Sequence, residues 1–237
     1  MAIINDIWNR NYILEKYKDL SEKDKSLLFY YSLMDSSMFN EPGFNYSSDK
    51  FSHEIKRFFR KKFKIKTSEI NDADLDRYFY TNLFTSKINN ILISTELGRR
   101  LKTSANPSIK WGDNEVDCVL PHYKFFIETK RVYSAGDIGD YIIDNIEKYR
   151  NGDITYKDIT IKKVLINLIF ISDNENEEKI FHKRTTMGYH SIFSKFSEKG
   201  YIPKFLEFYT SYFYKGKNIN EFFDSFCYRI KSLNTKK

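Results

Sequence analysis

One segment limits the fold of this chain more than any other, the run Lys-Val-Leu-Ile-Asn-Leu-Ile-Phe-Ile-Ser at positions 163–172. A strand with one face in water alternates apolar and polar residues, whereas a strand buried on both faces is apolar almost throughout. The run has the second pattern. A strand of this kind needs helices on both sides of its sheet, so the sequence predicts an α/β fold with a mixed sheet flanked by helices.

The segments around this run alternate between helix and strand patterns. Apolar residues at helical spacing predict helices over 85–101 and 137–149. β-Branched and aromatic residues predict strands over 108–111, 115–120 and 125–132. A core at 85–172 therefore has the order helix, three strands, helix, strand. Helices are also expected in the flanking parts of one compact unit, at 4–18, 22–34, 53–64 and 72–84 in an N-terminal region 1–84, and at 219–233 in a mostly helical C-terminal region 173–237.

Two of the predicted strands carry a group of charged residues. If 115–120 and 125–132 form a hairpin that turns between His122 and Tyr123, Asp117 lies directly opposite Glu128. Side chains opposite each other on antiparallel strands have Cβ atoms about 5 Å apart and project from the same face. Lys130 shares that face, since strand side chains alternate with a period of two. The pattern thus predicts two carboxylates and a lysine in one place.

This combination suits a metal site. Two adjacent carboxylates repel each other unless a cation lies between them, and oxygen ligands suit Mg²⁺. Lys130 would then orient or deprotonate a water molecule, or stabilise negative charge in a transition state. The alternative is a surface hairpin with ordinary cross-strand ion pairs, because Glu115 is predicted to lie opposite Lys130.

The order of elements and the charged residues together resemble the PD-(D/E)XK nuclease superfamily, the fold of many restriction endonucleases. The resemblance covers roughly 85–172, and Val116 stands where many members have proline. It implies that Asp117 and Glu128 bind Mg²⁺, with Mn²⁺ as a substitute, and that Lys130 is the catalytic lysine. It also implies that Glu96, on the helix before the strands, is an auxiliary catalytic residue and metal ligand. Glu115 is a rival for this third acid.

The function implied by this resemblance is hydrolysis of phosphodiester bonds in DNA. We expect a Mg²⁺-dependent endonuclease, of the type II restriction kind, that acts on double-stranded DNA as a homodimer. An RNA endonuclease with the same core is one alternative, since the chemistry does not distinguish the sugars. A catalytically silent nucleic-acid-binding subunit is the other.

The charge distribution supports a polyanionic partner. The chain carries a net charge of +7, and seven of its lysines and arginines fall within 53–66. Ile55, Phe58, Phe59 and Phe63 form an apolar helical stripe there, so the basic residues occupy the opposite face. Such a face attracts a phosphate backbone, although a merely solvated face is the alternative. The candidate nucleic-acid contacts are Lys56, Arg57, Arg60 and Lys61 in this segment, and Arg99 and Arg100 after Glu96.

Other classes of function have little support in the sequence. The four histidines lie far apart, and there is no zinc motif, P-loop, dinucleotide-binding glycine pattern or nucleophile elbow. Cys118 and Cys227 are expected to be free thiols in a reducing compartment. The first residues lack the basic start and apolar stretch of a secretion signal, and no segment is apolar enough to span a membrane. We therefore expect a cytoplasmic protein without a membrane partner.

Overall fold

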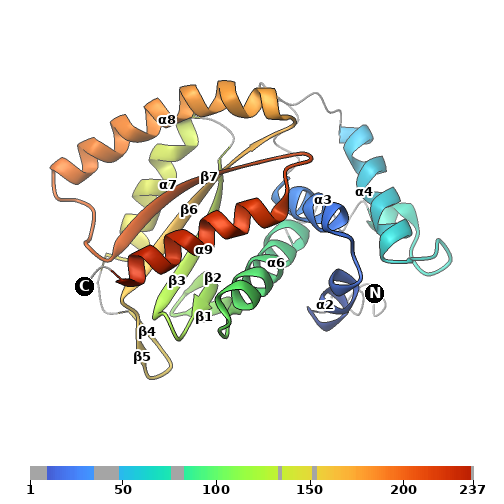
Figure 1. Cartoon of the computed structure of the whole chain (residues 1–237), viewed down its shortest axis with the longest axis horizontal. Helices are drawn as coiled ribbons and strands as arrows, with labels where there is room; N and C mark the ends of the chain where they lie inside the picture. Colours follow the sequence, from blue (N-terminus) through green and yellow to red (C-terminus); the bar gives the residue numbers. More distant parts are fainter. Residues whose placement is uncertain (1–9, 35–47, 76–82, 133–134, 151–153, 236–237) are drawn as a thin grey trace.

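A five-stranded mixed sheet forms the centre of the computed structural model, which describes residues 10–34, 48–75, 83–132, 135–150 and 154–235 (Figure 1). Its strands lie in the order β1-β2-β3-β6-β7. Their bounds are Asn106–Trp111 for β1, Asn114–Leu120 for β2, Phe125–Val132 for β3, Lys163–Ser172 for β6 and Leu206–Tyr214 for β7. The first three strands are antiparallel, and β3, β6 and β7 are parallel. The sheet is therefore mixed, as the sequence predicts.

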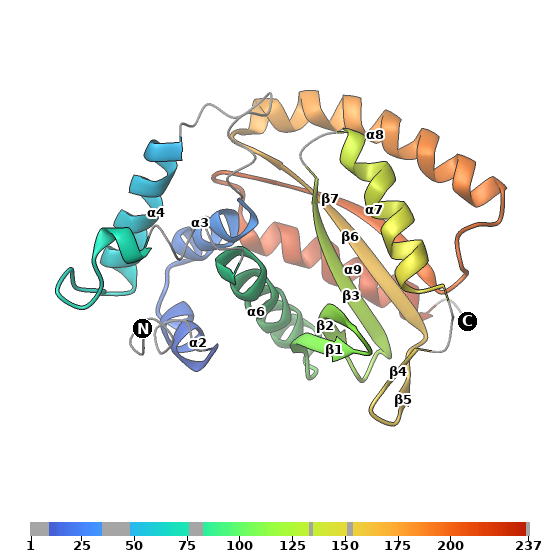
Figure 2. The same ribbon diagram turned by 180° about the vertical axis from the view of Figure 1, so that it is seen from behind.

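Helices cover both faces of this sheet, as the two opposite views show (Figures 1 and 2). One face carries α6 (Leu83–Leu101) and α9 (Ile219–Thr235), and the other carries α7 (Ala135–Lys148) and α8 (Glu175–Glu198). The N-terminal helices α2 (Arg10–Lys18), α3 (Glu22–Leu33) and α4 (Ser48–Lys62) extend the layer that contains α6. None of the described helices combines the length and apolar composition that a membrane-spanning segment requires.

Strand β6 is buried on both faces, which confirms the prediction made from its apolar run. Leu165 and Ile169 belong to the hydrophobic cluster on the α6 and α9 side. Ile166 and Phe170, which alternate with them, belong to the cluster on the α7 and α8 side. The alternation follows from the period of two along a strand, and it places β6 between two separate apolar layers.

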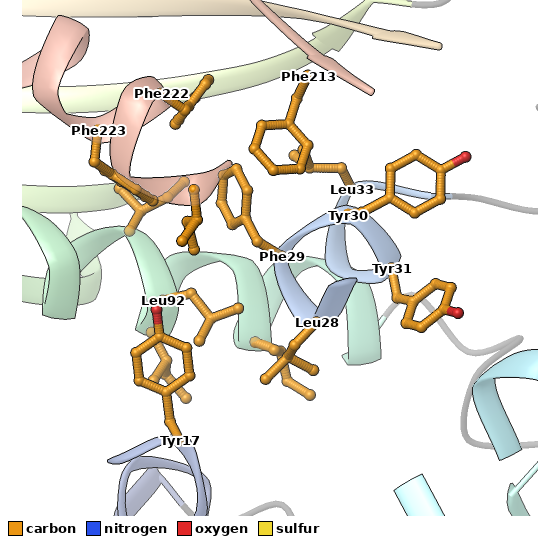
Figure 3. Close-up of a cluster of buried hydrophobic side chains, with 14 of the residues drawn as sticks. Tyr17, Leu28, Phe29, Tyr30, Tyr31, Leu33, Leu92, Phe213, Phe222 and Phe223 are labelled. Atoms are coloured by element: carbon orange, nitrogen blue, oxygen red, sulfur yellow. The ribbon is translucent and has the colours of Figure 1, made fainter. Parts of the chain in front are cut away.

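The terminal parts of the chain share a single aromatic core. Phe29 of α3 contacts Phe213 of β7 with ring centroids 4.8 Å apart, and it contacts Phe222 and Phe223 of α9 at 5.1 and 5.2 Å. Figure 3 shows these rings converging above Leu92 of α6. Aromatic pairs at such distances stabilise a core beyond the effect of buried area alone. The helical segments at the two ends therefore pack against one another and against the sheet-flanking helix α6.

Most predicted elements have counterparts in the structure. Residues 173–237 are mostly helical, as predicted, through α8 and α9, but β7, which was not predicted, lies between these helices and adds a fifth strand at the edge of the sheet. A two-stranded hairpin, β4 (Thr155–Tyr156) with β5 (Ile159–Thr160), was also not predicted. Of the predicted helix at 72–84, residues 72–75 and 83–84 are described, and both parts are helical, the second as the start of α6. Residues 4–9 of the first predicted helix lie outside the described part.

Candidate functional site

The hairpin that carries the candidate acids has the register that the sequence predicts. Cys118 pairs with Ile127, and Leu120 pairs with Phe125 across the β2–β3 ladder. Cys118 and Ile127 are fully buried in the cluster beneath α6. The ladder ends at Cys118, so the predicted pairing of Asp117 with Glu128 on one face does not form: Asp117 contacts Asn90 of α6, whereas Glu128 contacts Lys148 and Tyr149 on the α7 side.

The regular β2–β3 ladder stops at Asp117, because the side chain of Asp117, and not its backbone, accepts the hydrogen bond from the backbone of β3. Its Oδ2 accepts a hydrogen bond from the Thr129 backbone N–H at 2.7 Å and another from the Thr129 hydroxyl at 3.0 Å. Beyond this point β3 continues to Val132, and none of these described residues pairs with β2. Figure 2 shows the β1–β2 hairpin lying at an angle to β3. The edge of β3 is therefore open beside Thr129 and the residues after it.

The neighbouring strand is also irregular at this point. Ser108 of β1 lies across from Asp117 but drops out of the β1–β2 ladder, and its φ of 48° is in the left-handed region. A non-glycine residue pays a steric cost for that conformation, and such positions cluster at functional sites. Asn90 of α6 holds both residues, because its side-chain amide donates to Ser108 Oγ at 3.1 Å and to Asp117 Oδ1 at 3.3 Å. Helix α6 thus fixes the position of Asp117.

Glu128 lies on the other side of the sheet plane, beneath α7. Beside it in the parallel ladder is Ile166, a member of the cluster on the α7 side. The carboxylate is 1% exposed, and its Oε1 accepts hydrogen bonds from the Tyr149 hydroxyl and from Lys148 Nζ. Its Oε2 has a long contact of 3.4 Å with Lys130 Nζ. Oε2 is therefore the oxygen that remains for another ligand.

Lys130 is held in its charged form by the two carboxylates. Burial alone would lower the pKa of this lysine, but the charges of Glu128 and Asp117 outweigh burial and raise it. Its side chain is 28% exposed, so the ammonium group retains access to a ligand or to water. Lys130 can therefore supply positive charge and hydrogen bonds, whereas a role as a proton acceptor would require the carboxylates to be neutralised first.

A cavity of about 240 Å³ opens where β2 separates from β3. It is lined by Asn89, Asn90, Asp117, Thr129, Lys130, Arg131 and Tyr141. Burial raises the pKa of Asp117, and the nearby charge of Glu128 raises it further. This mutual repulsion is the condition that a bound cation relieves. The cavity therefore combines an acid, an adjacent second acid and a cation in a partly enclosed space.

The donor set fits Mg²⁺ with few protein ligands. Among the described residues, no three His, Cys, Asp or Glu side chains gather into a metal-binding cluster. Asp117 and Glu128 remain as two carboxylates, with Glu128 beneath the cavity rather than in its wall. Mg²⁺ commonly keeps several waters and takes only one or two carboxylates together with substrate phosphates. Two acids beside an open cavity meet that requirement.

The structure does not bring Glu96 to this site. Its Oε1 accepts a hydrogen bond from the Tyr17 hydroxyl at 2.8 Å, and its Oε2 pairs with Arg99 and Arg100 at 2.7 and 3.0 Å. Glu96 is 2% exposed and lies six residues beyond Asn90, which is about 9 Å along the helix axis. We therefore leave it out of the site.

The rival for the third acid is not placed at the site either. Glu115 is exposed and pairs with Lys110 of β1 in the ladder. Its backbone carbonyl accepts a hydrogen bond from Lys148. The cross-strand ion pair of Glu115 with Lys130, the alternative reading of the hairpin, is likewise absent among the described residues, since Lys130 contacts Glu128 instead.

No known protein supplies an independent identification. Neither a protein-family model, nor a characterised protein, nor a solved structure matches this chain. The function must therefore be argued from the side chains and their geometry.

The candidate nucleic-acid contacts fall into two groups. On α4 the apolar stripe is buried as predicted, and the basic side forms a cavity of about 480 Å³ lined by His53, Lys56, Arg57, Arg60, Lys61 and Asp72. Arg57 and Lys61 are exposed there, whereas Lys56 is buried and Arg60 pairs with Asp72. Arg57 and Lys61 are therefore the cations best placed to meet a polyanion.

The second group, on α6, has a structural role. Arg100 joins α6 to α9, because its guanidinium contacts Glu96, Asp224 and Asn220. Its side chain is only 11% exposed. Arg99 is 59% exposed but pairs with Glu96, away from Asp117. Neither arginine lines the cavity beside Asp117, so the structure does not bring these two candidate nucleic-acid contacts to the acids.

Several residues at the site were not found from the sequence. Asn90, Thr129, Tyr149 and Arg131 contact the acids or line the cavity beside them. A signal was available for one of them, because Asn90 and its neighbour Asn89 interrupt the apolar face of α6 and are both buried. Buried amides in an apolar stripe indicate a local polar site.

Proposed function

We propose that this chain is a Mg²⁺-dependent nuclease that hydrolyses phosphodiester bonds in nucleic acid, with double-stranded DNA as the expected substrate. The observation that carries the proposal is the position of Asp117, Glu128 and Lys130 together at the open edge of β3, where a cavity of about 240 Å³ begins. The sheet order and the helix on each side are consistent with a core of the restriction-endonuclease kind.

In this proposal Asp117 and Glu128, through its Oε2, would hold the metal. When bound, Mg²⁺ polarises a phosphoryl oxygen and lowers the pKa of a water molecule, and Mn²⁺, which also accepts oxygen ligands, is expected to substitute for it. Thr129 and Asn90 orient Asp117. Loss of such a supporting hydrogen bond typically lowers metal affinity by about 10- to 100-fold.

Lys130 supplies the other part of the proposed chemistry. Its pKa is raised by the two carboxylates, so it is a cation at neutral pH. A fixed ammonium group beside the cavity favours negative charge that develops on a phosphoryl group in the transition state. We therefore assign Lys130 to charge stabilisation and to the orientation of water.

The exposed cations of α4 support a nucleic-acid partner. Arg57 and Lys61 line a basic cavity of about 480 Å³ that lies on a different helix from the acids. A phosphate backbone binds such a surface without regard to sequence and with strong dependence on salt. This surface would hold the substrate, while the acids and Lys130 act on one phosphodiester bond.

A second candidate is a nucleic-acid-binding subunit without catalytic activity. One observation favours it: Glu128 is buried and already receives three donors, from Tyr149, Lys148 and Lys130. If Glu128 cannot exchange one of these donors for a metal ion, the chain binds nucleic acid but does not cleave it.

The test is an incubation of the protein with supercoiled DNA, single-stranded DNA and RNA, each with Mg²⁺ or with EDTA. Asp117→Ala should abolish cleavage, and Asp113→Ala, at an exposed acid of the β1–β2 turn, should not. Cleavage of RNA alone would identify the RNA endonuclease. Binding without cleavage under any divalent metal would favour the silent subunit, and an Asp117→Ala protein that cuts as well as the wild type would refute the catalytic assignment.

The proposal also has a consequence for the oligomeric state. Each chain offers one pair of acids, so a double-strand cut requires two copies or two successive events. We expect a homodimer, as the resemblance to restriction enzymes implies. Sedimentation at micromolar concentration, with and without DNA, distinguishes a dimer from a monomer.

A further inference from the structure

Arg131, the residue after the candidate catalytic lysine, has a buried donor without a partner. Its Nη1 is inaccessible to solvent and forms no hydrogen bond with any residue that the structure describes. A guanidinium group stays charged at every ordinary pH and presents five N–H donors. A buried donor that lacks an acceptor opposes folding, and more strongly when the group is charged. Arg131 also lines the cavity beside Asp117, so a movement of its side chain would bring this donor to an acceptor held there.

The position of Arg131 complements that of Lys130. Along the β3–β6 ladder Arg131 lies beside Ile169, whose side chain belongs to the cluster on the α6 side. Lys130 lies beside Leu168, which belongs to the cluster on the α7 side. Both residues nevertheless line the same cavity, because β2 has left the edge of β3. Two cations therefore approach the cavity from opposite faces of the sheet.

Asp117 does not already satisfy this arginine. Oδ2 of Asp117 accepts two hydrogen bonds from Thr129, and Oδ1 accepts one from Asn90. Nη1 of Arg131 has none of these oxygens as a hydrogen-bond partner. Asp117 therefore does not supply the missing acceptor for Nη1 of Arg131 through an internal ion pair.

The chemistry of the group defines its ligand. A guanidinium group binds two oxygens of a phosphate or carboxylate through parallel N–H donors, which an ammonium group cannot do. The cavity also contains an acid, so a free anion meets repulsion there unless another positive charge accompanies it. A phosphodiester group that arrives with a divalent cation meets no such repulsion.

We propose that Arg131 binds the non-bridging oxygens of a phosphate group in the nucleic-acid strand that enters this cavity. Lys130 and Arg131 then contact that strand from the two faces of the sheet. The inference rests on the proposed function in taking nucleic acid as the ligand, but it requires only binding and does not depend on cleavage. It adds a substrate-binding residue that the charge pattern of the sequence does not single out.

The first test is the affinity for a fluorescently labelled oligonucleotide duplex in Ca²⁺, a divalent cation that also takes oxygen ligands, measured by anisotropy between 50 and 200 mM salt. Arg131→Met should weaken binding by roughly ten- to a hundredfold and should lower the salt slope by about 1. Arg131→Lys should keep the salt slope but lose affinity, since it retains the charge and lacks the paired donors. Arg150→Met, at an exposed arginine outside the cavity, is the matched control and should bind within about twofold of the wild type.

The second test separates binding from a structural role. Without nucleic acid, Arg131→Met should melt at the same temperature as the wild type or above it, because an unsatisfied donor has been removed. With the duplex present, the wild type should be stabilised more than the variant. A large loss of stability in both Arg131 variants without nucleic acid would show that the arginine supports the fold, and would overturn the proposal.

The outcomes also separate this inference from the nuclease assignment. If the wild type cuts DNA in Mg²⁺ while Arg131→Met binds and cuts normally, the inference about Arg131 fails alone. If the wild type binds but never cuts, and Arg131→Met does not bind, the nuclease assignment fails and Arg131 remains a phosphate-binding residue.

Discussion

Replacing Tyr149 with phenylalanine tests how the candidate acid Glu128 is held. The Tyr149 hydroxyl donates to Oε1 of Glu128, and both side chains are almost completely buried. Burial and the Glu128 charge raise the pKa of Tyr149, so the hydroxyl remains a donor at any pH that an assay would use. The ring stacks on Trp111 with centroids 5.3 Å apart and an angle of 19°, and phenylalanine preserves that contact. The substitution therefore removes one hydrogen bond and little else.

The expected loss of stability in Tyr149→Phe follows from the negative charge of the acceptor, Glu128. A hydrogen bond to a charged group contributes about 1.5–3 kcal/mol, so Tyr149→Phe should lower the free energy of unfolding by roughly 2 kcal/mol. For a chain of 237 residues this corresponds to a melting temperature about 4–8 °C lower. Because Glu128 is less firmly positioned without this hydrogen bond, the affinity for Mg²⁺ should fall about tenfold or more. The metal dependence of cleavage measures this affinity.

Tyr17→Phe is the matched control. Its hydroxyl donates to the buried carboxylate of Glu96 at 2.8 Å, so the variant loses the same kind of bond at an acid outside the site. It should lose similar stability, measured by thermal melting, and retain its metal dependence. An unchanged melting temperature for Tyr149→Phe would refute the view that this bond positions Glu128. An equal loss of metal affinity in both variants would show that the effect is not specific to the site.

Three further changes have expected outcomes. Asp117→Asn should raise the melting temperature in EDTA at pH 7, because burial and then Glu128 raise the pKa of this carboxyl, so that its ionised form opposes folding. The difference in melting temperature from the wild type should vanish as the pH falls to the unfolded-state pKa of about 4. A melting series from about pH 4 to 8 measures this difference. Cys118 and Cys227 should not react with a thiol reagent at pH 8 until guanidinium unfolds the chain, because burial raises both pKa values, that of Cys227 to about 11. Arg57→Glu combined with Lys61→Glu should weaken nucleic-acid binding and lower its salt slope by about 2, as measured by anisotropy; an unchanged slope would exclude this surface.

The hairpin could be predicted from the sequence because its determinants are local. Two strands with a period of two are joined by a four-residue connection, and Lys124 N–H bonds to the Pro121 carbonyl within it. The pairing of Cys118 with Ile127 follows from that turn. What the pattern could not show is the break at Asp117, since it depends on Ser108 adopting a left-handed conformation beside Asn90.

The third acid could not be predicted because its position depends on packing between elements. Helical spacing places Glu96 near the edge of the apolar face of α6, but it does not show which turn of the helix lies next to β2. The contacts of Ile88 and Leu92 with the rest of the core set that position, and they bring Asn90 to Asp117. Glu96 lies farther along the helix, among arginines that neutralise it.

Strand β7 was missed for a different reason. Its sequence, Leu-Glu-Phe-Tyr-Thr-Ser-Tyr-Phe-Tyr at 206–214, is rich in residues that favour strands, but aromatic residues lie on both of its faces, with Tyr209 on the α6 and α9 side and Tyr212 on the α7 and α8 side. The contrast between the two faces is therefore weak, and the period of two is hard to see. Pairing with β6, which is distant in the sequence, completes the strand.

The central claim is tested most directly by the initial rate of supercoiled plasmid cleavage in Mg²⁺ for the wild type, Glu128→Gln and Glu96→Gln. Both glutamates are buried, and each accepts a hydrogen bond from a tyrosine hydroxyl, but only Glu128 lies beside Asp117 and Lys130. We predict that the wild type cuts in Mg²⁺ and not in EDTA, that Glu128→Gln loses at least about a hundredfold in rate, and that Glu96→Gln, if folded, cuts like the wild type. Cleavage by Glu128→Gln at the wild-type rate, or cleavage that persists in EDTA, would contradict the account.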